Sequence, residues 1–476
     1  MVQRTFLRTS ALVLSTCALL VHTSAQSIGA GYGHGIAICT DSTVMTWGWN
    51  LSGQLGNGYP TFTGDCQCFT YAAPIAYLDS VVAVAGGEYH SVALRADGTV
   101  RVWGLGASGQ LGYGFYPTNP CTCAAIPVQP IGLPPITKIA AGEDHTIAIA
   151  ADSTVWAWGD NSHGQLGDGI GFAIASPVHV VGLDDVVSVA CGNMHSLAIK
   201  SDGTVWAWGS NDHGQLGDSS YTNSNVPVQV HSLADVVAVD GGDWHSVALK
   251  SDGSVWVWGS NYHNQLLDTT AADTLVPIPI NGLNDVRAIT AGRYYTAVLK
   301  NDSTVWSWAY NNYSQMGNGT WGLDVDTLIQ ATALTGVVQI ASEGEHTMAL
   351  KSDGAVWSWG YNYYGQVGDN TRLDRSTPVQ MWNLCPAAIS LPTAEVAPTD
   401  PIRVAPNPFD DRITITSRDV GTNARYQLFT LSGTLVLSGA LHYGTIDTQG
   451  IRAGCYVLDI HKADGGSLGR ALVMKM

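Results

Sequence analysis

The stretch GDWHSVALKSDGSVWVWGSNYHNQLLD, residues 242–268, combines three tryptophans and two histidines with several glycines. Such residues can build an active site or a packed repeat. The histidine of this stretch, His245, recurs along the chain at His34, His90, His145, His195 and His346, and Tyr295 takes its place in the sixth unit. The gaps between these seven positions are 56, 55, 50, 50, 50 and 51 residues. Self-similarity with a period near 50 residues is typical of a propeller or array whose unit is one small sheet.

Other letters of the stretch recur at the same period. A Trp-Gly step recurs in almost every unit, as in "RVWG", "WAWG" and "WSWG". A glutamine follows a few residues later in the same unit, in "GQLG", "NQLL", "SQMG" or "GQVG". The whole chain holds 54 glycines and 16 tryptophans with only 12% charged residues. This composition suits short strands joined by tight turns better than helices.

Each unit divides into four predicted strands. In the fifth unit they are strand A over 235–242, strand B over 245–250, strand C over 254–259 and strand D over 276–280. Strand A is rich in small residues and glycine, as needed where sheets crowd towards an axis. Strand C is apolar on both faces, which indicates a sheet sandwiched between neighbours. Gly253 lies in the turn between strands B and C and is free to take positive φ.

The pattern GxxHSxALKSDGTVWxWGxNxxGQLG resembles the repeat of the regulator-of-chromosome-condensation family, which implies an all-β fold, a seven-bladed β-propeller of four-stranded blades. Departures from the pattern are Met45, Arg101, Tyr295 and Ala309. The expected domains are a signal peptide at 1–25, the propeller at 26–385, a Pro-rich linker at 386–401 and a C-terminal domain at 402–476. The seven units are expected near 26–78, 79–133, 134–183, 184–233, 234–283, 284–334 and 335–385.

The repeated histidines and tryptophans are predicted to be scaffold. A residue that recurs in every repeat usually serves the packing of the repeat. We expect each imidazole to be buried and to bond backbone groups of its own blade. Because these histidines belong to different blades, they are too far apart to form a metal site. We predict no cofactor and no metal.

Function is therefore expected where the units differ. Strand parity places the A–B turns and the C–D loops on one face of the ring, here called the top face. The two residues before each repeated histidine form the A–B turn, and they change from blade to blade. Aromatic and acidic residues are the usual composition of a protein-binding surface. The predicted ligand-binding residues are Tyr32, Glu88, Tyr89, Glu143, Asp144, Met194, Asp243, Trp244, Arg293, Tyr294 and Glu345. The C–D loops add aromatic residues, namely Tyr59, Tyr71, Tyr113, Phe115, Tyr116, Tyr221 and Trp321.

Eight of the nine cysteines follow the predicted signal peptide. Cys66, Cys68, Cys121 and Cys123 lie in the C–D loops of adjacent blades, where disulfides between the loops compete with a four-thiolate zinc site. Cys39 ends strand B of blade 1 and Cys385 follows strand D of blade 7. A disulfide between them would staple the ring, at about 4–5 kcal/mol in the entropy model. Cys191 is predicted to be a buried free thiol.

The N-terminus is predicted to be a secretory signal. Arg4 and Arg8 precede an apolar run, and small residues up to Ala25 permit cleavage before Gln26. Cys17 leaves a lipoprotein open as the alternative. No later stretch is long or apolar enough to span a membrane. The net charge is −17, and residues 27–388 carry 11 basic against 30 acidic side chains. Such a surface repels phosphate backbones, so nucleic acid is not an expected partner.

The last 75 residues alternate as short strands with "SG" and "DGG" turns, which predicts a small β-sandwich. The segment resembles the type A C-terminal sorting domain of the type IX secretion system. The residues that carry the likeness are Pro406, Asn407, Pro408, Gly433, Gly450, Gly454 and Tyr456. The resemblance implies export by the type IX machinery of a Gram-negative bacterium, removal of this domain, and release or anchoring at the cell surface.

Three classes of function compete. The first is a secreted, monomeric propeller that binds an extracellular protein or glycan; the resemblance supports it, because exported bacterial members of the family include a β-lactamase-inhibiting propeller. The second is guanine-nucleotide exchange, the eukaryotic role of the family, which export opposes. The third is a glycan-acting enzyme, which needs a pair of carboxylates. Glu88, Glu143, Asp144 and Asp243 share the top face without a visible pairing, and no catalytic motif is present. The sequence therefore favours a binding module that is not an enzyme.

Overall fold

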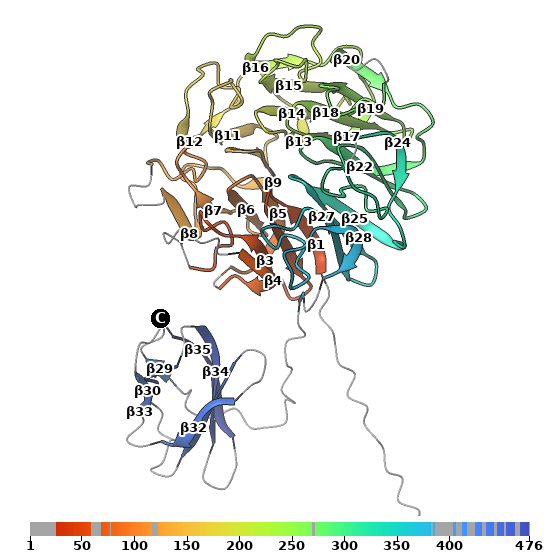
Figure 1. Ribbon diagram of the computed structural model, residues 1–476. Helices are drawn as coiled ribbons and strands as arrows, with labels where there is room; N and C mark the ends of the chain where they lie inside the picture. Colours follow the sequence, from red (N-terminus) through yellow and green to blue (C-terminus); the bar gives the residue numbers. More distant parts are fainter. Residues whose placement is uncertain are drawn as a thin grey trace, which may run out of the picture. The chain divides into compact units, whose positions relative to one another are not determined.

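The computed structural model describes residues 25–58, 68–76, 78–116, 122–268, 272–322, 324–381, 384–385, 403–405, 412–416, 424–430, 435–441, 445–451, 454–461 and 467–475. The chain divides into two compact units, Met1–Ala388 and Ile389–Met476. The first unit is a ring of seven four-stranded sheets (Figure 1). The predicted signal peptide (except Ala25) and the predicted linker lie outside the described residues.

Every blade is built from four consecutive strands. Blade 1 contains β1 (Ala25–Ala30), β2 (His34–Cys39), β3 (Val44–Trp49) and β4 (Cys68–Pro74). Blade 2 contains β5 (Val81–Gly86), β6 (His90–Arg95), β7 (Val100–Leu105) and β8 (Cys123–Val128). Blade 3 contains β9 (Ile136–Ala141), β10 (His145–Ala150), β11 (Val155–Gly159) and β12 (Ile174–His179). Blade 4 contains β13 (Val186–Cys191), β14 (His195–Lys200), β15 (Val205–Gly209) and β16 (Ser224–Gln229).

The remaining three blades follow the same plan. Blade 5 contains β17 (Val236–Gly241), β18 (His245–Lys250), β19 (Val255–Gly259) and β20 (Thr274–Pro279). Blade 6 contains β21 (Val286–Ala291), β22 (Tyr295–Lys300), β23 (Val305–Ala309) and β24 (Val325–Gln330). Blade 7 contains β25 (Val337–Ser342), β26 (His346–Lys351), β27 (Val356–Gly360) and β28 (Arg375–Gln380). The predicted all-β, seven-bladed propeller is thus confirmed.

The first strand of each blade lines the axis of the ring. Each of these strands packs against the first strand of the next blade, and β25 packs against β1 to close the circle. Their small residues permit this close approach. The turn between β18 and β19 contains Gly253 at φ +82°, as its place in the repeat predicts. Because the first and third strands run the same way, the A–B turns of all blades gather on the top face around the axis.

Repeated tryptophans join each blade to its neighbour. The tryptophan of the Trp-Gly or Trp-Ala step is fully buried in every blade, and its Nε1 donates to the carbonyl of the repeated glutamine one blade back. Trp258 bonds the Gln215 carbonyl at 2.8 Å in this way, and Trp47 closes the circle by donating to the Gln366 carbonyl at 2.8 Å. The tryptophans are therefore inter-blade packing residues, as their recurrence predicts.

The repeated histidines also link blades, and here the detailed prediction was wrong. Their Nε2 atoms do not bond backbone groups of the same blade but meet a hydroxyl of the next blade. His245 Nε2 lies 3.0 Å from Thr296 Oγ1, and His195 Nε2 lies 2.9 Å from Ser246 Oγ. The Ser246 hydroxyl in turn donates to the Gln215 carbonyl at 2.9 Å. Burial lowers the pKa of these histidines to about 3–4, so the imidazoles are neutral.

Two blades depart from this pattern of histidine–hydroxyl contacts. Tyr295 replaces the histidine of blade 6 and donates across the same boundary, to the His346 carbonyl at 2.7 Å. His346 meets no hydroxyl, because blade 1 has Gly35 at the matching position. A Cβ atom there would lie 2.2 Å from the Trp47 ring, so only glycine fits.

The ring closes between blades 7 and 1 without an exchanged strand. Cys39 and Cys385 form a disulfide with a Cα–Cα distance of 5.5 Å, which confirms the predicted staple. Gln339 adds a second link, because its Nε2 donates to the Ile28 carbonyl and its Oε1 accepts from the Ile28 amide, at 2.9 and 3.2 Å. Closure thus rests on covalent and side-chain contacts at the junction.

The second unit consists of two antiparallel sheets, as the predicted sandwich requires. The first has the order β29 (Arg403–Ala405), β30 (Arg412–Thr416) and β33 (Thr445–Asp447). The second has the order β32 (Leu435–Ala440), β31 (Arg425–Thr430), β34 (Gly454–His461) and β35 (Ser467–Lys475). Side chains of both sheets, such as Ile413, Leu428 and Leu458, share one buried cluster. A search of the described residues found no helix long and apolar enough to cross a membrane.

Candidate functional site

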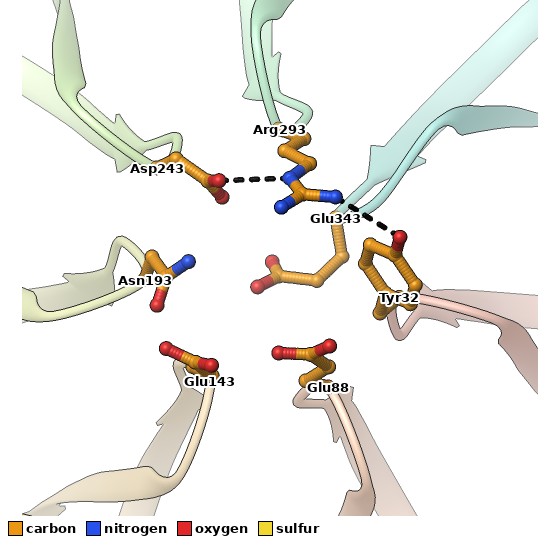
Figure 2. Close-up of a pocket in the computed structure, with 7 residues that line it drawn as sticks. All are labelled: Tyr32, Glu88, Glu143, Asn193, Asp243, Arg293 and Glu343. Atoms are coloured by element: carbon orange, nitrogen blue, oxygen red, sulfur yellow. Dashed lines mark hydrogen bonds and ion pairs between the residues drawn. The ribbon is translucent and has the colours of Figure 1, made fainter. Parts of the chain in front are cut away.

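The seven blades meet in a pocket at the centre of the top face. Figure 2 shows one side chain from each blade pointing towards the axis; in six blades it is the first residue of the A–B turn, and in blade 7 it is Glu343, just before that turn. The cavity measures about 110 Å³ and is lined by Tyr32, Glu88, Glu143, Asn193, Asp243, Arg293 and Glu343. Five of the predicted ligand-binding residues are among these. The structure therefore brings together side chains that lie up to 311 residues apart in the sequence, Tyr32 and Glu343.

A single cation organises one side of this pocket. Arg293 Nε donates to Asp243 Oδ2 at 2.9 Å, and its Nη1 donates to the Tyr32 hydroxyl at 3.0 Å (Figure 2). Glu345 Oε1 lies 4.0 Å from Nη1. The guanidinium also lies over two rings, 5.4 Å from the centroid of Tyr32 and 5.0 Å from that of Tyr294. Arg293 is thus held by carboxylates in its plane and by aromatic faces.

The other side of the pocket is acidic and lacks a cation of its own. Glu143 is half-buried and hydrogen-bonds Glu88 of the adjacent blade, and its desolvation and this bond raise the pKa of Glu143 to about 9. Burial and the nearby Asp240, Asp243, Glu88 and Glu143 raise the pKa of Glu343 well above its usual range. Among the described residues, no ion pair involves Glu88, Glu143 or Glu343. Glu88 and Glu143 thus interact with each other, a pairing that is not visible in the sequence.

Glu343 was missed in the sequence. It occupies the position that glycine holds in the other six blades, immediately before the two-residue A–B turn. Its side chain lies deep in the protein and points to the middle of the pocket, where it keeps some accessible surface because it lines the cavity (Figure 2). The signal was available as the one break in the repeated glycine, "SEGEHT" in blade 7.

An arc of aromatic rings borders the pocket. We call it the aromatic arc; its members are His213, Trp244, Tyr294, His263, Tyr310, Tyr313, Tyr361, Tyr364, Trp49 and Tyr89. Neighbouring centroids lie 4.3–6.2 Å apart, from blade 4 round to blade 2. Trp49 and Tyr364 stack with an interplanar angle of 6°, across the junction of blades 1 and 7. All ten rings are partly accessible to solvent, and none belongs to the buried core.

The aromatic arc contains three of the predicted residues and seven that were not predicted. Tyr89, Trp244 and Tyr294 follow pocket residues directly in their A–B turns. Trp49, Tyr310 and Tyr361 follow the Trp-Gly or Trp-Ala step, and the other four stand just before the repeated glutamine. That segment was assigned to repeat packing as a whole. The variation of this segment from blade to blade could have revealed the arc. The residue after the Trp-Gly or Trp-Ala step is Trp49, Leu105, Asp160, Ser210, Ser260, Tyr310 or Tyr361.

The sector without large rings is polar. Asp144 accepts from Gln110 Nε2 at 2.7 Å and from Ser108 Oγ at 3.2 Å, and burial raises the pKa of Asp144 to about 6. Asp160 of blade 3 accepts from Gln165 Nε2 at 2.7 Å. Met194 is half-buried beside Asn193 in the turn of blade 4. The top face is therefore divided into an aromatic arc and an acidic sector, with the pocket between them.

The aromatic residues of the C–D loops are separate from the arc. Phe69 pairs with Tyr71, and Tyr113 pairs with Phe115, at centroid distances of 6.2 and 4.4 Å. Tyr221 and Trp321 are 55% and 77% exposed. Tyr59 lies outside the described residues. Among the described residues, no ring of this set contacts a ring of the aromatic arc.

The cysteines follow the disulfide prediction where they are described. Cys68 and Cys123 are both disulfide-bonded, which removes the thiolates that the zinc alternative needs. Cys66 and Cys121 lie outside the described residues. Cys191 is buried and free, as predicted. Within the part of the chain that the structure describes, no group of three or more His, Cys, Asp or Glu is placed to hold a metal ion.

Family models match both units of the chain. Regulator of chromosome condensation (RCC1) repeats match residues 25–54, 41–94, 81–110, 97–149 and 136–165, and an RCC1-like domain matches 173–391. A secretion system C-terminal sorting domain matches 403–475. Of the residues that carry that likeness, Gly450, Gly454 and Tyr456 are described, with Tyr456 buried in the second unit. Pro406, Asn407, Pro408 and Gly433 lie outside the described residues.

Curated relatives share part of the propeller. The chain is 34% identical over 145 residues to the probable E3 ubiquitin-protein ligase HERC6 of Homo sapiens, which covers 30% of this chain and 13% of that protein. It is 32% identical over 145 residues to the ultraviolet-B receptor UVR8 of Arabidopsis thaliana, covering 30% and 31%. The chain thus matches less than a third of the length of either relative.

Solved structures show the same fold. Human WBSCR16 is similar with a TM-score of 0.64 and 24% identity, covering 71% of this chain and 94% of that one. Yeast RCC1 (Prp20), in the structure with Kap60, gives a TM-score of 0.64 and 20% identity, covering 80% and 91%. The sorting domain indicates type IX secretion, to the medium or to the outer surface. The chain is a secreted member of the RCC1-repeat propeller family that carries a type IX C-terminal sorting domain.

Proposed function

We propose that the propeller is a binding module that holds an extracellular protein on its top face. The observation that carries the proposal is the aromatic arc beside the acidic pocket. Ten rings in one contiguous surface offer large contact areas at little cost in side-chain entropy, and such residues dominate the energetics of protein interfaces. If the rings served only to pack against one another, they would not need to lie at the mouth of a polar cavity.

Size favours a protein ligand over a glycan. The pocket of about 110 Å³ is smaller than the cavity of about 150 Å³ that accommodates a benzene ring. A pyranose with its hydroxyl groups would therefore have to remain outside, on the aromatic arc. A protein can cover the arc and also extend one side chain into the pocket. We therefore place a glycan second among the binding ligands.

One observation favours a second candidate, a glycan-acting hydrolase. Glu88 and Glu143 form a carboxyl pair, and the raised pKa of Glu143, about 9, is that of a proton donor at neutral pH. Glycosidases, however, separate their two carboxyl groups by about 5–10 Å to leave room for the substrate. Because Glu88 and Glu143 are hydrogen-bonded to each other, this arrangement supports catalysis less well than binding. Guanine-nucleotide exchange ranks last, since export removes the chain from cytosolic GTPases.

Affinity capture tests the proposal. The exported protein is immobilised and exposed to cell-surface and medium fractions, and bound proteins are identified by mass spectrometry. We expect one protein to bind saturably to the wild type and to be lost from the Tyr89→Ala, Trp244→Ala, Tyr294→Ala triple variant. The matched control is Tyr71→Ala, Tyr221→Ala, Trp321→Ala, which removes the same residue types away from the arc. Equal recovery on the arc variant and the wild type would contradict the proposal, and turnover of a glycan panel would favour the hydrolase.

A further inference from the structure

We propose, as a deepening of the proposed function on which it rests, that the central pocket receives the cationic end of a lysine or arginine side chain of the bound protein. The proposal concerns the acidic side of the pocket, formed by Glu88, Glu143 and Glu343, together with Asn193. Four observations carry it: the charge of the pocket, its unused acceptors, its size, and the way in which it already holds one guanidinium.

The charges of the pocket do not balance. Its lining contains four carboxylates, Glu88, Glu143, Asp243 and Glu343, and one cation, Arg293. Arg293 is engaged by Asp243 at 2.9 Å and faces Glu345 at 4.0 Å. Three carboxyl groups therefore share the opposite side without an ion pair among the described residues. Without a cation these carboxyl groups avoid the cost of a buried charge by holding protons, as the raised pKa values of Glu143 and Glu343 indicate. An entering cation would replace those protons and pair with the ionised carboxylates.

Two acceptors in the pocket are not used by the protein itself. Asn193 Oδ1 is fully buried and has no hydrogen-bond partner among the described residues. The Glu343 carboxyl group lies deep in the protein and points to the axis in Figure 2, and it too has no hydrogen-bond partner in the described part of the chain. Buried polar groups are normally paired, and an exception calls for an explanation such as a missing partner. A donor that enters along the axis would meet the Glu343 carboxyl group, which Figure 2 shows at the centre of the pocket.

The volume and geometry limit what can enter. A cavity of about 110 Å³ has room for a few heavy atoms, by comparison with the benzene cavity of about 150 Å³. A guanidinium or an ammonium with its last methylene groups fits this room. Both groups only donate hydrogen bonds, which suits a lining that offers acceptors. The longer stem of such a side chain would then pass the aromatic arc at the mouth.

The pocket already shows how it holds a cation. Arg293 combines an in-plane carboxylate, Asp243, with the faces of Tyr32 and Tyr294. An incoming basic side chain would find the same combination, carboxyl groups below and aromatic rings at the rim. Cation–π and charge-assisted hydrogen bonds reinforce each other in such sites.

The test compares two probes that differ only in charge. The full exported protein is titrated with Nα-acetyl-arginine methylamide and with the neutral isostere Nα-acetyl-citrulline methylamide, with binding followed by NMR or calorimetry. We expect the arginine probe to bind at least about tenfold more tightly, the size of one charge-assisted contact. In Glu343→Gln that preference should disappear. Asp353→Asn removes the same charge from a B–C turn of the same blade and should leave the preference unchanged.

The outcomes separate this inference from the proposed function. Equal binding of the two probes to the wild type, or an undiminished preference in Glu343→Gln, overturns the cation pocket. If Glu343→Gln also binds the captured protein as tightly as the wild type, the cation pocket fails while top-face binding stands. If 1,4-butanediamine occupies the pocket and does not compete with the captured protein, a free amine is the ligand and the inference is wrong. Because burial and the neighbouring acids raise the pKa of Glu343 and keep it protonated in the free pocket, Glu343→Gln replaces one neutral side chain by another, and its melting temperature should equal or exceed that of the wild type.

Discussion

Arg293 of blade 6 donates from Nε to Asp243 Oδ2 of blade 5 at 2.9 Å, across the boundary between two A–B turns. The same guanidinium reaches the Tyr32 hydroxyl of blade 1 at 3.0 Å. One side chain thus ties three blades together at the point where they converge. Because Asp243 is buried, this contact is structural as well as electrostatic.

Removal of the Arg293 side chain should destabilise the propeller. Arg293→Gln leaves the Asp243 carboxylate buried without a cation, which should lower the free energy of unfolding by about 2–3 kcal/mol. Asp243→Asn in the same chain should recover part of this loss, because the uncompensated charge is then gone. Chemical denaturation of the two single variants and the double variant gives the coupling energy. Additive losses would show that the two side chains do not interact.

Stability should fall as the pH rises from 6.5 to 8.5. Glu143 has a folded-state pKa of about 9, and that of Glu343 is also raised, so the folded protein keeps protons that the unfolded chain releases. The slope of the free energy of unfolding is then negative, up to about 1.4 kcal/mol per pH unit for each group. The buried histidines do not contribute here, because their folded pKa values of about 3–4 lie below the unfolded value of 6.5.

A variant isolates this effect. Glu143→Gln should flatten the pH dependence between 6.5 and 8.5, since glutamine does not titrate and keeps the shape of the side chain. Denaturation midpoints at four pH values are sufficient to compare the slopes. An identical slope in the variant and the wild type would mean that Glu143 is ionised in the folded protein at neutral pH.

The Cys39–Cys385 disulfide should be the main lock of the ring. The bond spans 346 residues, and its removal frees the unfolded chain from a very long loop. For a loop of this length the entropy model gives about 6 kcal/mol, somewhat more than the value expected from the sequence alone. Cys39→Ala with Cys385→Ala should therefore melt at a clearly lower temperature than the wild type. Cys191→Ala is the control, as Cys191 is buried and free. The account of ring closure fails if the double variant melts with the control.

The fold could be predicted because the residues that specify it recur in almost every blade. A histidine, a Trp-Gly step and a glutamine return about every 50 residues, and each performs one inter-blade contact, such as Trp258 to the Gln215 carbonyl. The partner of the histidine could not be predicted with equal certainty. The hydroxyl that meets His245 belongs to Thr296 of the next blade, and only the geometry of neighbouring blades relates the two.

The pocket could be predicted in part. Tyr32, Glu88, Glu143, Asp243 and Arg293 were found because they vary at a turn whose place on the ring is fixed by strand parity. Glu343 was missed because it stands at a glycine position that was treated as invariant. Most of the aromatic arc was missed for a different reason. Contacts such as Trp49 with Tyr364 join the first and last blades, and no local pattern in the sequence relates them.

The most direct test of the central claim is the affinity of the captured extracellular protein for the wild type and the Tyr89→Ala, Trp244→Ala, Tyr294→Ala variant, measured by surface plasmon resonance. We predict a loss of at least about a hundredfold, since central aromatic residues of an interface each contribute about 2 kcal/mol or more. The Tyr71→Ala, Tyr221→Ala, Trp321→Ala control should bind within a few-fold of the wild type. Unchanged affinity of the arc variant, with its fold intact by circular dichroism, would contradict the claim that the aromatic arc of the top face binds the partner.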